Sequence, residues 1–143
     1  MKKLFGFVSV IFLSALSCGP ASAQQSAIAG TWMTTLNPNT PAIIYVTLSL
    51  LPNGTLQERF MNRQAFAYEM FGTYQFDAAR GTLRYVYTDY QPRQLCSAIG
   101  CQPAPVPPNP LNAPMTAQIS FPTAAQMVGT ASDGAQAIWS RAQ

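Results

Sequence analysis

The feature that most constrains the fold is an alternation of apolar and polar side chains over short segments separated by turn sequences. Residues 42–51 show it best, with Ile44, Val46, Leu48 and Leu50 on one face of the segment. A period of two places successive side chains on opposite faces of a β-strand. Helical periodicity is weak along the rest of the chain. The sequence therefore predicts an all-β fold.

Turn sequences divide the chain after residue 29 into seven or eight short strands. They are expected over residues 30–36, 42–51, 55–62, 71–77, 82–90, 115–121, 126–132 and 135–141. Residues 63–70 fit either a short strand or a helical turn. Pro52-Asn53-Gly54 and Asp133-Gly134 are hairpin signals. Consecutive hairpins favour a small antiparallel up-and-down barrel of about eight strands, which removes exposed edges. A two-sheet sandwich is the alternative.

Residues 91–114 interrupt the strand pattern. This segment holds seven of the twelve prolines and two of the three cysteines. Its part from Pro103 to Pro110 is expected to be extended, as in polyproline. Cys96 and Cys101 enclose four residues, a spacing that indicates a structural disulfide in an oxidising compartment, whereas a redox pair favours C-x-x-C. We expect a Pro-rich, disulfide-bearing loop inserted into the barrel.

The first residues have the pattern of a secretory signal. Lys2 and Lys3 precede an apolar stretch over residues 4–16, and Ala21-Ser22-Ala23 supplies the small residues needed for cleavage. The apolar stretch is shorter than the ~20 residues that span a bilayer. Cleavage before Cys18, with lipid attached to that cysteine as in bacterial lipoproteins, is the alternative.

This signal sets the expected domain organisation. We predict a signal peptide over residues 1–23, followed by a single barrel domain over residues 24–143. The mature chain should contain no transmembrane segment. The protein is therefore expected to be periplasmic or secreted, with anchoring through Cys18 as the less favoured outcome.

The composition of the expected mature chain argues against catalysis. Beyond residue 23 the sequence has six arginines, five acidic residues, no lysine and no histidine. Without His or Lys, no Ser-His-Asp, Cys-His or Ser-Lys arrangement can form. The acids are scattered, so neither a pair of catalytic carboxylates nor a calcium site is indicated. We predict a non-enzyme without metal or cofactor, and a nearly neutral surface that does not favour nucleic acid.

Short motifs resemble those of lipocalin-like (calycin) barrels of bacteria. Gly30-Thr31-Trp32 opens the first expected strand, and Trp139-Ser140-Arg141 closes the last. The turn at residues 50–55 and the strand start at Gly72-Thr73-Tyr74 also fit, whereas residues 91–114 do not. The resemblance implies that Trp32 plugs one end of the barrel and that Arg141 lies over its ring as a cation–π contact. Both residues would be structural.

An eight-stranded barrel has room for its own side chains or for one small ligand. Tyr45, Tyr85 and Tyr87 are the residues expected to line an opening, with Asp89 at its rim, although such tyrosines are also common strand residues. Glu58, beside Arg59, and Arg84 are expected to be solvated charges of the outer face.

Two functions follow as expectations from fold resemblance and composition. The first is an exported, non-catalytic binding module for a small apolar ligand. The second is a protein-binding or inhibitory module that acts through the Pro-rich loop. A purely structural envelope protein is a further reading.

Overall fold

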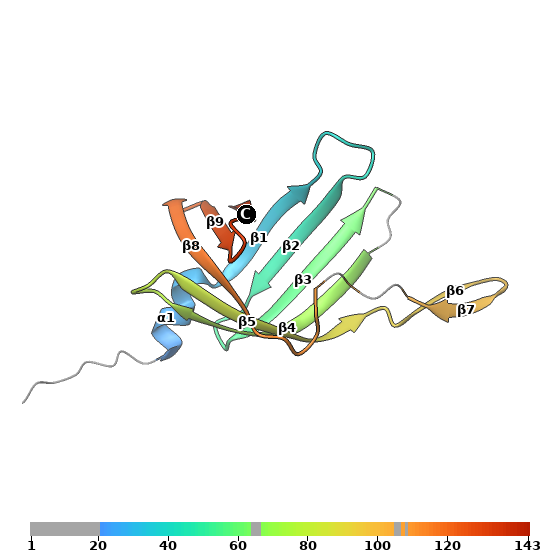
Figure 1. The fold of residues 1–143 in the computed structure, drawn as a ribbon, viewed down its shortest axis with the longest axis horizontal. Helices are drawn as coiled ribbons and strands as arrows, with labels where there is room; N and C mark the ends of the chain where they lie inside the picture. Colours follow the sequence, from blue (N-terminus) through green and yellow to red (C-terminus); the bar gives the residue numbers. More distant parts are fainter. Residues whose placement is uncertain (1–20, 64–66, 105–106, 108) are drawn as a thin grey trace, which may run out of the picture.

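A computed structural model describes residues 21–63, 67–104, 107 and 109–143, and its centre is a closed barrel of eight antiparallel strands (Figure 1). The barrel strands are β1 (Gly30–Leu36), β2 (Ile44–Leu50), β3 (Thr55–Asn62), β4 (Ala67–Asp77), β5 (Thr82–Gln91), β8 (Met115–Thr123), β9 (Gln126–Ala131) and β10 (Gln136–Arg141). Around the barrel the order is β1-β10-β9-β8-β5-β4-β3-β2, so every strand pairs with its neighbours along the chain. The predicted up-and-down barrel is confirmed, and the sandwich alternative is not.

Most predicted strands agree with the observed ones. β1 and β3 have the predicted bounds, and the others differ by a few residues. The open question over residues 63–70 is partly answered, because residues 67–70 form the start of β4. Residues 64–66 lie outside the described part of the chain.

The alternation of apolar residues fixes which face of each strand points inward. On β2, Val46, Leu48 and Leu50 are buried, while Tyr45 on the opposite face is exposed. Burying apolar surface stabilises the fold by roughly 25 cal/mol per Å². A slip of one residue would place this aliphatic face in water, so the register of the barrel is strongly specified.

One end of the barrel is closed by α1 (Ala21–Ile28) (Figure 1), which contacts the Trp32 side chain. Ile28 and Trp32 are fully buried, and Trp32 Nε1 donates a hydrogen bond to the Ile28 carbonyl at 3.0 Å. The Arg141 guanidinium lies over the Trp32 ring, 4.5 Å from its centroid. The predicted contact between the two residues is confirmed. Residues 24–28, which precede the first predicted strand, form most of this helix.

Residues 1–20, which contain Cys18 and most of the predicted signal peptide, lie outside the described residues. The expected cleavage sequence Ala21-Ser22-Ala23 forms the beginning of α1. Within the described ranges, no helix combines the length and apolar character that a membrane crossing requires.

The segment between β5 and β8 leaves the barrel as a separate hairpin of β6 (Gln94–Ser97) and β7 (Gly100–Pro103) (Figure 1). The predicted disulfide joins Cys96 to Cys101, which face each other across this hairpin. Ile99 in the hairpin turn is 95% exposed. Of the predicted extended stretch 103–110, residues 105, 106 and 108 lie outside the described residues. Ala104 and Pro107 are buried, and the chain pairs with the barrel again at Leu111, which bridges to Tyr87 of β5.

Candidate functional site

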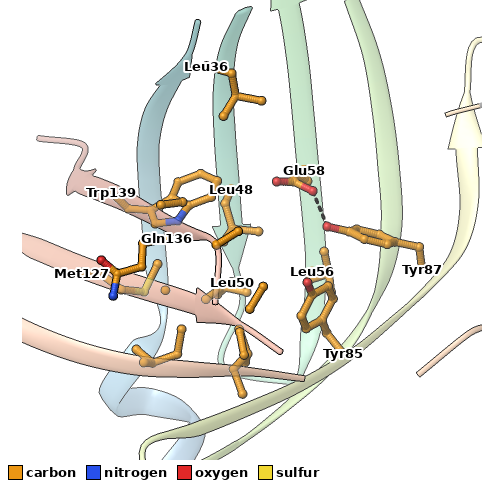
Figure 2. A pocket seen from close by; sticks show the side chains of 17 residues that line it. Leu36, Leu48, Leu50, Leu56, Glu58, Tyr85, Tyr87, Met127, Gln136 and Trp139 are labelled. Carbon is orange, nitrogen blue, oxygen red and sulfur yellow. Dashed lines mark hydrogen bonds between the residues drawn. The ribbon is translucent and has the colours of Figure 1, made fainter. Parts of the chain in front are cut away.

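The barrel encloses a cavity of about 320 Å³ (Figure 2). Its walls are mainly apolar and come from both halves of the barrel. Apart from the tyrosines Tyr85 and Tyr87, the larger side chains are Leu36, Leu48, Leu50, Leu56, Leu83, Ile119, Met127 and Trp139. The volume lies at the lower end of the ~300–1,000 Å³ range of ligand pockets. The cavity is also about twice the ~150 Å³ of an apolar cavity that holds benzene.

Small residues on β8, β9 and β10 explain why the barrel is not filled by its own side chains. Ala117, Gly129, Ala131 and Ala137 line the cavity where the opposite wall presents leucines. Interiors normally pack without voids larger than a water molecule. A wall of small residues facing a wall of large ones therefore leaves a space that a ligand can occupy.

The cavity opens toward solvent near the meeting of the first and last strands. Leu36 is 40% exposed, and Ala135 and Gln136 are also exposed lining residues. The ladder between β1 and β10 contains two residue pairs, Trp32 with Arg141 and Met33 with Ser140. Backbone pairing ends after these two pairs, and beyond them the hydrogen bond from Thr34 Oγ1 to the Ile138 carbonyl at 2.7 Å links the strands next to the exposed lining residues.

Glu58 is the one acidic residue among the described residues that line this cavity. It is 7% exposed and accepts a buried hydrogen bond through Oε2 from the Tyr87 hydroxyl (Figure 2). The expectation that Glu58 is a solvated outer-face charge is wrong. Strand alternation places it inward with Leu56 and Phe60, which are also buried. The neighbouring Arg59 points outward, half-exposed, and pairs there with Glu69 at 3.6 Å.

Burial controls the ionisation of this polar pair. Loss of hydration raises the pKa of the Glu58 carboxyl from 4.5 to about 7, and the hydrogen bond from Tyr87 opposes part of that rise. Burial and the nearby Glu58 also raise the pKa of the Tyr87 and Tyr85 phenols above their usual range. Near neutral pH the tyrosines are therefore neutral donors, while the carboxyl changes charge.

Two of the four predicted ligand-binding residues line the cavity, and two do not. Tyr85 and Tyr87 come from β5, with their rings edge-to-face at 5.6 Å between centroids. Tyr45 is 40% exposed on the outer face of β2 and is not among the lining residues. Asp89 does not line the cavity either, and it pairs with Arg93 on the outside. Arg84 is exposed, as expected.

A β-bulge explains the position of Asp89. Phe71 pairs with Asp89 while the next residue, Gly72, pairs with Tyr87, so Thr88 is an extra residue in β5. An extra residue reverses the alternation beyond it. Tyr85 and Tyr87 consequently point inward, but beyond the bulge it is Tyr90, not Asp89, that is buried.

At Gly72 the backbones of β4 and β5 lie closer together than a side chain at this position would allow. A Cβ atom at residue 72 would lie 2.0 Å from the Val86 carbonyl oxygen, a backbone atom that cannot rotate away. Only glycine therefore fits where β4 crosses the bulged part of β5.

Sequence reasoning missed Glu58 and the small-residue wall. Alternation on the predicted strand 55–62 already placed Glu58 on the face of Leu56, but the charge favoured an outward position. Ala117, Ala131 and Ala137 also lie at the inward positions that alternation gives on their strands. Alanine is common on both faces of a strand, so these residues alone did not indicate a cavity wall.

Among the described residues, no group of three or more His, Cys, Asp or Glu side chains could hold a metal ion. Comparison of the sequence with known protein families and with curated proteins finds no match. The fold and the cavity therefore define the class: a closed eight-stranded antiparallel β-barrel with an apolar internal cavity and a buried carboxyl.

Proposed function

We propose that this protein is an exported, non-catalytic binding module for a small apolar ligand. The single observation that carries the proposal is the apolar cavity of about 320 Å³ inside the barrel. The disulfide supports a location outside the cytoplasm, because structural disulfides persist in oxidising compartments. The barrel is consistent with the lipocalin-like family that the sequence motifs resemble, and membership in that family is part of the proposal.

The cavity can be tested by filling it. Ala137 lines it from β10, and the next residue, Ile138, is 57% exposed on the outside. We expect Ala137→Leu to weaken binding of n-propylbenzene, measured by calorimetry, by at least about tenfold, because the new side chain occupies ligand space. The neighbouring variant Ile138→Ala should leave the affinity unchanged.

Thermal unfolding of both variants, followed by circular dichroism, shows whether the barrel is intact. The proposal is contradicted if the wild-type protein does not bind n-propylbenzene. Equal affinities of Ala137→Leu and the wild type would contradict it as well, since the ligand would then bind elsewhere.

A second candidate function is protein binding through the segment between β5 and β8. The observation that favours it is the disulfide-bridged hairpin, which projects from the barrel (Figure 1) and exposes 95% of Ile99 in its turn. A constrained hairpin loses little conformational entropy on binding. Pull-down from periplasmic extract with the wild type and with Ile99→Ser tests it: loss of a captured protein supports this function, and identical capture contradicts it.

A further inference from the structure

The buried carboxyl narrows the chemistry of the ligand. An ionised carboxylate can accept about four hydrogen bonds, and the bond from Tyr87 uses one of them. The other described residues that line the cavity include no arginine, and the sequence has no lysine beyond Lys3 and no histidine. Among these lining residues, Glu58 therefore has no cationic partner.

The surroundings of Glu58 also suit a cation. Tyr85 and Tyr87 stand beside it, and Figure 2 shows Trp139 and Met127 on the opposite side of the cavity. The remaining walls are aliphatic, so the cavity offers an acceptor on one side and an apolar surface for a hydrophobic body on the other.

We propose that the cavity selects apolar ligands with a protonated amine, whose ammonium group binds Glu58 while the hydrocarbon part fills the space toward Trp139. This inference rests on the proposed function, because it names the ligand class of the same cavity. A buried charge is stabilised when a partner of opposite charge is held beside it. The ligand supplies the counter-ion that the cavity walls lack.

The volume limits the size of such a ligand. About 320 Å³ fits a single aromatic ring with a short aminoalkyl chain, or an alkylamine of similar size. 2-Phenylethylamine and n-propylbenzene are therefore suitable probes. They have nearly the same shape and differ only in an ammonium or methyl group at the end of the chain.

The test compares both probes on the wild type and on Glu58→Gln by calorimetry at pH 8, where Glu58 and the amine are both charged. We expect the substitution to weaken 2-phenylethylamine binding about thirtyfold or more, because a buried charge pair is lost. Binding of n-propylbenzene should change less than about threefold. Glu69→Gln is the matched control, since it removes the same charge from the outer face and should change neither affinity.

A second readout detects the charge pair directly. The titratable groups that face Glu58 are Tyr85 and Tyr87 of β5 and Tyr68 of β4, all of which stay protonated near neutral pH because burial raises their pKa values. At pH 6, amine binding should therefore release roughly two-thirds of a proton or more, from Glu58, and n-propylbenzene should release none. Calorimetry in buffers with different ionisation enthalpies measures this number.

The outcomes separate the two proposals. If n-propylbenzene binds and the amine does not, or if Glu58→Gln weakens both probes equally, the ammonium inference is overturned while the apolar site stands. If neither probe binds the wild type, the proposed function fails and the inference fails with it. Loss of amine binding in Glu69→Gln would also overturn the inference, because the effect would then be one of net charge.

Discussion

Glu58 occupies an inward strand position between Leu56 and Phe60, where an apolar side chain would normally lie. Burying a carboxyl costs free energy unless it is hydrogen-bonded or neutral. Two features reduce this cost. Tyr87 donates a hydrogen bond to the carboxyl, and burial raises the carboxyl pKa to about 7, so that the neutral form is present below that pH. A residue kept at such a position is a candidate for function rather than for stability.

The stability of the protein should depend on pH through Glu58. Its pKa is raised in the folded state, so the folded protein holds the proton more tightly than the unfolded chain. The contribution of Glu58 to the free energy of unfolding should therefore be largest below pH 4.5 and should fall as the pH rises from 4.5 to about 7. The upper limit of this fall is about 3–4 kcal/mol, from 1.36 kcal/mol per unit of pKa.

Chemical denaturation of the wild type and of Glu58→Gln between pH 4.5 and about 7 measures the contribution of Glu58 to the free energy of unfolding. The amide introduced by this substitution can still accept a hydrogen bond from Tyr87 but does not titrate. The difference in unfolding free energy between the two proteins should change from pH 4.5 to pH 7 in favour of the variant. A difference that stays constant over this range would contradict the assignment.

Single residues were the part of the site least predictable from sequence. Tyr85 and Tyr87 follow from alternation on one strand, but the prediction for Tyr45 was wrong because alternation with Val46 puts it outside. The prediction for Asp89 was wrong because a β-bulge at Thr88 reverses the alternation beyond it. Threonine is an ordinary strand residue, so the sequence does not indicate this bulge. Glu58 was misplaced because charge was given more weight than its position on the strand.

At the scale of elements, the path of β4 past β5 depends on a backbone approach that only glycine allows. We expect Gly72→Ala to destabilise the protein by at least about 2 kcal/mol, since the new Cβ would clash with the Val86 carbonyl. Gly129→Ala is the matched control, because its nearest contact would be an ordinary 3.6 Å to Ile119. It should stabilise by up to about 1 kcal/mol.

Urea unfolding of Gly72→Ala, Gly129→Ala and the wild type measures these changes in the free energy of unfolding. If Gly72→Ala and Gly129→Ala have the same stability, the close approach of the two strands does not constrain residue 72. The bulge also decides which residue beyond it faces the interior, because it turns Asp89 outward and places Tyr90 inward, while Tyr87 before the bulge stays inward by alternation.

Strands and hairpins were predictable because their signals are local. The bounds of β1 and β3 follow from alternation and from flanking turn residues such as Asn37 and Gly54. α1 was missed because its sequence is short and has no clear apolar face. Its order depends on contacts with distant segments, such as the hydrogen bond from Gln25 Nε2 to the Tyr74 carbonyl.

At the scale of the whole molecule, α1 closes one end of the barrel. Its residue Ile28 is fully buried and accepts a hydrogen bond from Trp32. We expect Ile28→Ala to lower the free energy of unfolding by about 2–5 kcal/mol, as for other buried large-to-small substitutions. Ala27→Ser, at an exposed neighbouring position, should change it by less than about 0.5 kcal/mol. Thermal unfolding gives the melting temperatures of Ile28→Ala and Ala27→Ser. Equal melting temperatures would show that α1 does not stabilise the barrel.

The ladder that joins β1 to β10 pairs Trp32 with Arg141, two residues from opposite ends of the chain. During synthesis the amino-terminal strands emerge first, and sequential hairpins can pair as they appear. The barrel cannot close until its last strand has been delivered. Until then the apolar inner faces of β2 and β3 lack their opposite wall, so this protein depends on a late, long-range step to protect its interior from aggregation.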